Sequence, residues 1–299
     1  MTNRREFLAW SGAAAALAGS PVLAMGGKPA QLPTRTIPGR DERLPIIGLG
    51  NSRAFSDADT ATTRSLLEIF FGHGGAYIDI GGSARSFVGG VARKLGAADQ
   101  VFFGNYVDPV SQEVLEADVR EVAKAQGKVA LDLVHMRNLG RYRETIELFR
   151  RLKGEGLVRY IGIARSGSDG FPAIGRLIED GLVDFVQVNY SLLEPESADR
   201  LLPLAKDHGV AVNINRPFIN GRYFERVSRH ELPEWAIEFD CHSWAQFSLK
   251  FILANAAVTC VLTETSNPKH ALDNIGGGFG ALPDMRTQLR MLAYIRELG

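Results

Sequence analysis

The sequence of 299 residues predicts an α/β protein built as a closed (β/α)₈ TIM barrel. Helical segments end in glycine, and a short run of apolar and β-branched residues follows each glycine at once, as at Gly127, Gly156, Gly181 and Gly209. A glycine just after a helix tolerates the left-handed backbone that ends the helix. These glycines recur at about the length of one strand-helix unit, and strands that alternate with helices form a parallel sheet.

Eight apolar runs are expected to be strands. They lie near 45–49, 76–80, 101–105, 129–135, 158–164, 184–189, 210–215 and 258–263. Eight strands, each followed by a helix, favour a closed barrel of about 250 residues over an open doubly wound sheet. No glycine-rich turn follows the first run, so a Rossmann dinucleotide site is not supported. A strand pair around 35–37 and 43–44 is expected to plug the bottom of the barrel.

The segments between these runs have the spacing of amphipathic helices. Leu67 and Phe70 share one face ahead of the second run, and Leu115, Val119 and Val122 share another ahead of the fourth. Apolar residues at this spacing mark the face of a helix that packs on the sheet.

Composition and charge exclude several classes of protein. Apolar residues make up 45% and charged residues 23%, which is ordinary for a globular protein. The formal net charge is zero, so electrostatics do not favour binding to nucleic acid or to an anionic membrane. Cys241 and Cys260 form neither a disulfide framework nor a metal-ligand pattern. They could pair in an oxidising compartment, but one lies at a predicted helix start and the other inside a strand.

Residues 1–24 are predicted to be an export signal rather than part of the fold. Arg4 and Arg5 precede Phe7 and Leu8, and an alanine-rich stretch too short to span a bilayer follows. This pattern resembles a twin-arginine signal, and the alternative is an ordinary secretory signal with two chance arginines. We therefore expect the twin-arginine export machinery as a partner, a periplasmic location, a linker over 25–34 and a barrel domain over 35–299.

Six local motifs, in order over most of residues 33–290, resemble those of the aldo-keto reductases. They are Ile-Gly-Leu-Gly at 47–50, Tyr-Ile-Asp at 77–79, Arg-Tyr-Ile-Gly-Ile at 159–163, Val-Gln-Val-Asn-Tyr at 186–190, Arg-Pro-Phe at 216–218, and Thr-Ser-Asn-Pro at 265–268 with Asp-Asn at 273–274. They fall at the carboxyl ends of predicted strands, where barrel enzymes place their active sites. The resemblance implies an NADP(H)-dependent oxidoreductase that reduces a small carbonyl substrate. It also implies a monomer.

The family's chemistry needs a tyrosine as proton donor, a lysine paired with an aspartate that lowers the pKa of the tyrosine, and a histidine that orients the substrate. Asp79 matches the aspartate, and His135 matches the histidine. The tyrosine normally stands five residues after the aspartate, where this chain has Ala84. The lysine normally closes the third strand, where this chain has Tyr106.

Two interpretations of this departure stay open. In one, the site is degenerate and the barrel is a periplasmic binding or scaffold protein. In the other, the site is rebuilt: Tyr106 donates the proton beside His135, and Arg85 replaces the lysine as the cation that lowers the pKa of Tyr106. A metal-dependent barrel enzyme is a third idea, but Asp79 and His135 have no evident third ligand in the sequence.

The resemblance also suggests residues that bind the cofactor. Gln187 would contact the nicotinamide carboxamide. The others are Arg165, Arg216, Ser266, Asn267, His270 and Asn274. An ion pair at the rim of the barrel is the alternative role of Arg165 and of Arg216. Glu264 replaces a glycine of the family and would oppose a bound phosphate, an effect that Lys269 and His270 would partly offset. The sequence does not identify the substrate.

Overall fold

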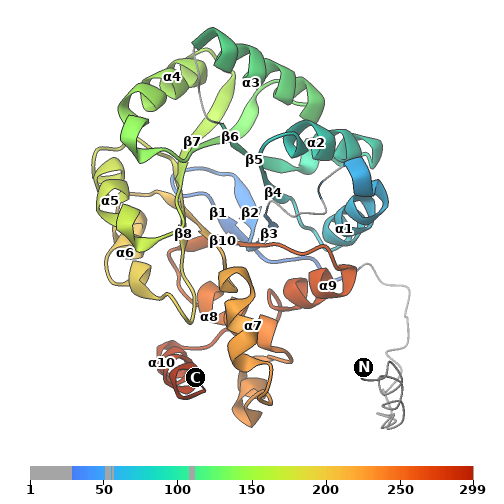
Figure 1. Cartoon of the computed structure of the whole chain (residues 1–299), viewed down its shortest axis with the longest axis vertical. Helices are drawn as coiled ribbons and strands as arrows, with labels where there is room; N and C mark the ends of the chain where they lie inside the picture. The colour runs from blue at the N-terminus through green and yellow to red at the C-terminus, as the bar shows by residue number, and fades with distance from the viewer. Residues whose placement is uncertain (1–28, 51–54, 56, 108–111, 299) are drawn as a thin grey trace, which may run out of the picture.

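A computed structural model describes residues 29–50, 55, 57–107 and 112–298. Eight parallel strands close into a barrel in the order β10-β3-β4-β5-β6-β7-β8-β9 (Figure 1). The strands are β3 (Ile47–Leu49), β4 (Tyr77–Ile80), β5 (Phe102–Tyr106), β6 (Leu131–Met136), β7 (Val158–Ala164), β8 (Phe185–Asn189), β9 (Ala211–Asn215) and β10 (Val258–Thr263). The predicted (β/α)₈ barrel is confirmed, and each strand begins within two residues of its expected start.

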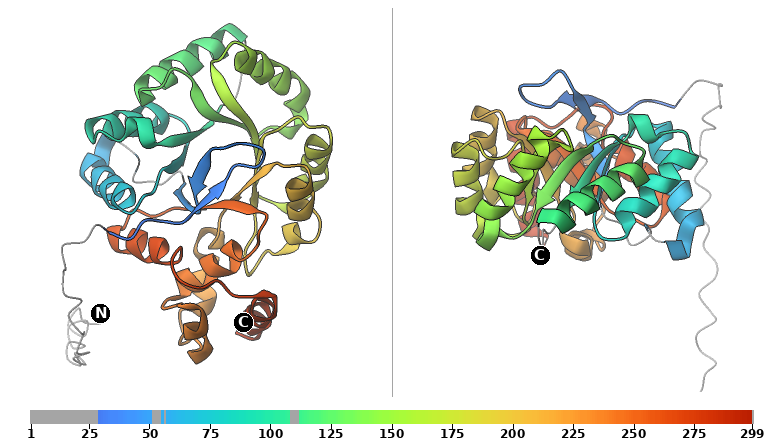
Figure 2. Two further views of the ribbon diagram at one scale, coloured as in Figure 1. Left: turned by 180° about the vertical axis from the view of Figure 1, so that it is seen from behind. Right: turned by 90° about the horizontal axis from the view of Figure 1, so that it is seen from above.

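The helices are α1 (Thr60–Gly72), α2 (Ala84–Lys94), α3 (Gln112–Gln126), α4 (Tyr142–Gly154), α5 (Phe171–Glu179), α6 (Leu201–Asp207), α7 (Arg222–Val227), α8 (Trp244–Leu253), α9 (Pro268–Gly276) and α10 (Met285–Glu297). Most of them surround the barrel as an outer ring, whereas α7 and α10 project beyond this ring (Figure 1 and Figure 2). The expected apolar faces are buried: Leu67 and Phe70 of α1, and Leu115, Val119 and Val122 of α3. Gly156 and Gly181 follow α4 and α5 with φ of +73° and +63°, as the glycine pattern predicted.

A hairpin plugs one end of the barrel. Its strands, β1 (Thr34–Thr36) and β2 (Arg43–Pro45), pair antiparallel and lie across the barrel end in Figure 2. Ile37 and Leu44 bury their side chains in a cluster with the aromatic residues that point into the barrel. The predicted plug is therefore confirmed, and the opposite end, where the strands have their carboxyl termini, is left for chemistry.

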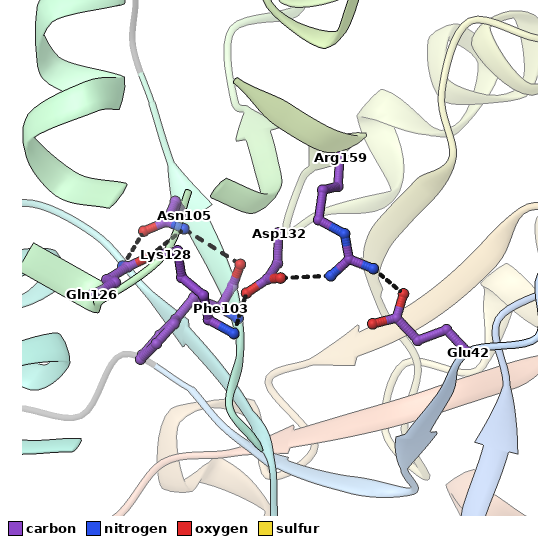
Figure 3. A network of polar contacts seen from close by, with 7 residues as sticks. All are labelled: Glu42, Phe103, Asn105, Gln126, Lys128, Asp132 and Arg159. Carbon is purple, nitrogen blue, oxygen red and sulfur yellow. Dashed lines mark hydrogen bonds and ion pairs between the residues drawn. The ribbon is translucent and has the colours of Figure 1, made fainter. Parts of the chain in front are cut away.

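Ion pairs fix this plug to the strands (Figure 3). Arg159 donates to Glu42, in the hairpin loop, at 2.6 Å and to Asp132 on β6 at 2.7 Å. The backbone N–H of Phe103 on β5 donates to the other oxygen of Asp132 at 3.0 Å. One buried carboxylate thus joins β5, β6, β7 and the hairpin.

The expected linker over 25–34 extends too far into the fold. Leu32 is 4% exposed, and its backbone N–H donates to the carbonyl of His73 at 2.8 Å. Residue 34 already begins β1. Since these contacts belong to the packed domain, the domain begins before residue 35. The predicted export signal, residues 1–24, lies outside the described residues.

Cys241 and Cys260 are both buried free thiols, so the structure does not pair them. Cys260 points into the barrel among the residues above the plug, and Cys241 precedes α8. Over the part of the chain that the structure describes, no helix combines the length and the apolar character that a membrane span requires.

Candidate active site

Four of the predicted site residues meet inside the barrel, on three neighbouring strands and on β8. Asp79 lies on β4, Tyr106 ends β5, His135 lies on β6 and Gln187 lies on β8. Tyr106 and His135 are register partners, and their ring centroids are 5.7 Å apart. Asp79, His135 and Gln187 are at most 2% exposed. The site therefore lies inside the barrel, toward the end opposite the hairpin.

Hydrogen bonds join this cluster through Gln187. Its Nε2 donates to the hydroxyl oxygen of Tyr106, and also to Oδ2 of Asp79 at 3.2 Å. The Tyr106 hydroxyl is also close enough to the Asp79 carboxyl group to lower the pKa of that group. Nε2 of His135 lies 3.5 Å from the other oxygen of Asp79. The phenol, the amide and the carboxyl group thus form one connected unit.

Burial changes the protonation of two of these groups. The pKa of Asp79 is raised from 3.8 to about 7, mainly because the group is removed from water, and the charge of Glu264 contributes to this rise. Hydrogen bonds from Tyr106 and Gln187 oppose this rise. Burial also raises the pKa of Tyr106 well above its ordinary value, and the charge of Asp79 adds to the effect. Tyr106 is therefore a neutral phenol at neutral pH.

His135 is neutral as well. Burial lowers its pKa from 6.5 to about 3. Neither ring nitrogen has a hydrogen-bond partner among the described residues. The ring fits because its neighbour on β7 is a glycine: a Cβ at Gly162 would lie 2.6 Å from Nδ1 of His135. An uncharged imidazole with unused nitrogens can hydrogen-bond a substrate oxygen.

The predicted role of Arg85 is not supported. Its guanidinium makes a two-pronged ion pair with Asp118 on α3, at 2.7 and 2.9 Å. The pKa of Tyr106 is raised rather than lowered, and Arg85 is not among its causes. The prediction failed because the partner of Arg85 lies on a different helix, 33 positions further along the chain. Arg85 joins α2 to α3 and does not act on the phenol.

Tyr106 occupies space beside the loop in which the family carries its tyrosine. Ala84, at the expected tyrosine position, is the first residue of α2 and is buried. A Cβ at Gly81 in the same loop would lie 3.1 Å from the ring of Tyr106. The phenol of Tyr106 therefore packs against this loop from the neighbouring strand.

Two further residues of the site were not predicted. The hydroxyl of Tyr77 lies 3.5 Å from Asp79 Oδ1 and accepts a hydrogen bond from Asn213 Nδ2 at 2.8 Å. Tyr77 stands two residues before Asp79, so strand alternation places both on the inner face. That periodicity could have identified Tyr77. Asn213, on β9, reaches Tyr77 on β4 only because the strands close into a barrel, so no local sequence pattern identifies it.

Several buried amide oxygens in the barrel mouth have no hydrogen-bond partner among the described residues. They are Oε1 of Gln187, Oδ1 of Asn213 and Oδ1 of Asn215. A buried acceptor left without a partner is costly, so such atoms are usually satisfied by a ligand or by water. These oxygens need a hydrogen-bond donor, and the carboxamide NH₂ of a nicotinamide is a suitable donor.

A cleft of about 340 Å³ lies beside the start of α9. Phe218 and Trp244 line it together with Glu264, His270 and Asn274. Its aromatic and polar walls suit an adenosine group. Two of the predicted cofactor residues, His270 and Asn274, thus face one hollow.

The other predicted cofactor residues are placed as follows. Ser266 and Asn267 are exposed ahead of α9, and the side chain of Asn267 caps its first turn. Arg165 lies at the end of β7 and pairs with Asp169 at 2.5 Å. Arg216 follows β9 with φ of +49°, and its buried Nε has no hydrogen-bond partner among the described residues.

This geometry agrees with a comparison against known families. Residues 47–288 match the sequence profile of the aldo/keto reductase family. The chain belongs to the aldo/keto reductase family. Its departures from the family's usual residues, at Ala84 and Tyr106, are therefore changes within a reductase barrel.

Two curated relatives match this aldo/keto reductase in part. An NADH-specific methylglyoxal reductase of Escherichia coli is 32% identical over 90 residues, which are 30% of this chain and 27% of the relative. The oxidoreductase YqkF of Bacillus subtilis is 24% identical over 201 residues, or 58% of this chain and 62% of the relative. The chain thus matches less than two thirds of the length of either relative.

Solved structures share the fold over nearly their whole length. The holo form of an aldo-keto reductase from Bacillus halodurans superposes with a TM-score of 0.69 at 21% identity, covering 89% of this chain and 96% of that one. A Klebsiella pneumoniae aldo-keto reductase in complex with NADPH gives 0.72 at 20% identity, covering 88% and 96%. At this identity the likeness establishes the barrel alone.

Proposed function

We propose that this protein is an NADP(H)-dependent oxidoreductase that reduces a carbonyl substrate, with Tyr106 as its proton donor. One observation carries the proposal: a single amide nitrogen of Gln187 donates to both the hydroxyl of Tyr106 and the carboxyl group of Asp79 at the barrel mouth, beside His135. A phenol held between an amide and a protonatable carboxyl group can give up a proton and be resupplied.

The polar atoms of the mouth support cofactor binding. Gln187 and Asn215 have amide oxygens without a hydrogen-bond partner among the described residues, and these would accept from a nicotinamide carboxamide. The cleft with His270 and Asn274 would hold the adenosine half. Arg216 directly follows β9, and Ser266 and Asn267 lie directly before α9, which carries His270 and Asn274. When bound, NADPH supplies a hydride to the carbonyl carbon.

The protein's own residues would manage the proton. His135, neutral and with unused nitrogens, orients the carbonyl oxygen. Tyr106 transfers its hydroxyl proton to that oxygen, and Asp79 returns its carboxyl proton to the phenol. The O–H bond of Tyr106 breaks as the O–H bond of the product alcohol forms, and the negative charge ends on the Asp79 carboxylate. Water then reprotonates Asp79, whose pKa is raised to about 7, so that the carboxyl group can hold a proton near neutral pH.

The alternative, a binding or scaffold barrel without turnover, has no support among the proteins compared above. Each of them is described as a reductase or an oxidoreductase. Every catalytic group that the proposal needs is also present at the mouth of the barrel.

The first test is a titration of the purified protein with NADPH, followed by nicotinamide fluorescence. The proposal expects saturable binding with a dissociation constant for NADPH on the order of 1 μM to 1 mM, the range in which enzymes commonly bind their substrates. Reduction of simple aldehydes is then assayed, and Gln187→Leu serves as a variant that should weaken binding. Absence of binding at millimolar NADPH would refute the proposal.

We also propose export of the folded protein to the periplasm by the twin-arginine machinery. Arg4 and Arg5, ahead of an alanine-rich apolar stretch, support it. Replacing both arginines by lysine should leave the protein in the cytoplasmic fraction, and unchanged export would contradict this route. A monomer in size-exclusion chromatography is expected.

A further inference from the structure

A second hollow lies at the carboxyl ends of β6 and β7, separate from the cleft beside α9. It has a volume of about 660 Å³ and is lined by Arg137, Asn138, Leu139, Gly140 and Arg165. Both charged residues in this lining are arginines. The hollow is therefore a cationic recess in a protein whose formal net charge is zero.

This recess opens directly beside the proposed proton donor. The guanidinium carbon of Arg137 lies 5.5 Å from the centroid of the Tyr106 ring. A group bound to Arg137 would thus be held within a few ångströms of a carbonyl that receives the Tyr106 proton. Only a small substrate could place both of its ends in this way.

Arg165 is held in place with a donor still unused. Its Nη2 pairs with Asp169 at 2.5 Å, yet its buried Nε has no hydrogen-bond partner among the described residues. The stem is packed against Gly170, where a Cβ would lie 2.8 Å from Cγ of Arg165. A buried N–H that lacks a partner is costly unless a ligand or water satisfies it.

The acidic groups of the barrel mouth favour this recess as the place for an anion. Asp169 neutralises part of the charge of Arg165, but Arg137 adds a second cation. Glu264 and Asp273 both line the other cleft, beside α9. The recess, which is lined by two arginines and no carboxylate, is therefore the more cationic of these two hollows.

We infer that the substrate is a small carbonyl compound that carries a carboxylate or phosphate group, and that Arg137 and Arg165 bind this anion while Tyr106 meets the carbonyl oxygen. Guanidinium groups match both anions because their N–H donors form a planar fork. The inference rests on the proposed reductase function, because it assigns the substrate class of the same site.

The test compares substrates that differ only in charge. One pair is 4-carboxybenzaldehyde and its neutral methyl ester, and the other is glyceraldehyde 3-phosphate and glyceraldehyde. The inference expects kcat/KM to be about 10- to 100-fold higher for at least one anionic member, the range of one charge-assisted hydrogen bond. The two pairs separate a carboxylate preference from a phosphate preference. Equal kcat/KM within both pairs would overturn the inference and leave the proposed reductase intact.

Arg137→Gln and Arg165→Gln identify the anion site. Each should lower the ratio of kcat/KM for the anionic member to kcat/KM for the neutral member by about tenfold or more, because only the anionic member loses a charged contact. Arg143→Gln, a change on α4 outside the recess, is the matched control and should not alter this ratio. An anion preference that survives both recess variants would refute this assignment.

A binding measurement separates the inference from the proposed function. Saturation-transfer NMR of 4-carboxybenzoate with the NADPH-loaded protein should show binding that Arg137→Gln weakens about tenfold or more. If this binding is seen without any carbonyl reduction, the anion site stands and the reductase function fails. If neither 4-carboxybenzoate nor inorganic phosphate binds, the anion site is refuted.

Discussion

The side-chain amide of Gln187 donates a hydrogen bond to the hydroxyl of Tyr106 across the mouth of the barrel. The same amide nitrogen donates to Asp79 at 3.2 Å. This arrangement places the phenol of Tyr106 where β5 ends, although the family carries its tyrosine after the preceding strand. The proposed proton donor thus comes from a different backbone position, while the carboxyl group of Asp79 and His135 keep the places expected for the family.

Replacement of Tyr106 by Phe should abolish most of the carbonyl reduction. The ring and its packing remain, but the hydroxyl that donates the proton is lost, so kcat should fall by about 10²–10⁴-fold. NADPH affinity should change little. Steady-state kinetics together with the fluorescence titration measure both quantities.

Tyr142→Phe is the control for this variant. Tyr142 begins α4, and its hydroxyl accepts from Arg143 at 3.3 Å, away from the site. It should keep full activity. Full activity in Tyr106→Phe itself would rule out Tyr106 as the donor.

The rate of reduction should fall as the pH rises through about 7. The reason is Asp79, whose pKa burial raises from 3.8 to about 7, so that the carboxyl proton which resupplies Tyr106 is lost above that pH. His135 should add no step near pH 6.5, because burial lowers its pKa to about 3. Single-turnover rates between about pH 5 and 9 provide the measurement. A rate independent of pH across this interval would be incompatible with the Asp79 proton supply.

The same carboxyl group should make stability depend on pH. Because the pKa of Asp79 is higher in the folded protein than in the unfolded chain, the folded state binds more protons between about pH 4 and 7, and its stability falls as the pH rises through that window. Asp79→Asn removes this term. As the pH rises from 4 to 7, the free energy of unfolding of the variant, relative to that of the wild type, should therefore increase by a few kcal/mol. The basis is about 1.4 kcal/mol per unit of pKa difference. Urea denaturation at several pH values measures it, and a constant difference would contradict the assignment.

The fold could be predicted because its signals are local. Glycines such as Gly156 end helices at positive φ, and the apolar runs that follow are strands buried on both faces. Asp79, His135 and Gln187 could be placed for the same reason, since a residue at a strand's carboxyl end must lie at the mouth of the barrel. The position of a residue along its strand was therefore enough to predict where these three side chains lie.

The rest of the site depends on contacts between distant segments. Arg85 was expected to replace the family's lysine as the cation beside Tyr106, yet the first turn of α2 directs it to Asp118 on α3. Asn213 reaches Tyr77 only because eight strands close into a ring. Leu32 is buried by its contact with the end of α1, which no local pattern shows.

The ion pair between Arg85 and Asp118 should matter for stability and not for catalysis. Both groups are partly exposed, at 14% and 35%, so their coupling in a double-mutant cycle should be about 1 kcal/mol. Arg85→Gln, Asp118→Asn and the double variant supply the cycle by urea denaturation. Their kcat should stay within about threefold of the wild type. A large loss of kcat in Arg85→Gln, with folding intact, would restore the catalytic role that the structure does not support.

The buried carboxylate of Asp132 should stabilise the closed barrel more than any surface ion pair. It is 2% exposed and bonds to Arg159 at 2.7 Å and to the backbone N–H of Phe103 at 3.0 Å. Asp132→Ala would leave that N–H without its partner, so the free energy of unfolding should fall by on the order of 2–3 kcal/mol. Glu68→Ala is the control: it breaks an exposed ion pair with Arg64 on α1 and should cost at most about 0.5 kcal/mol. Equal losses in the two variants would show that the carboxylate at the plug adds no more than a solvated helix pair.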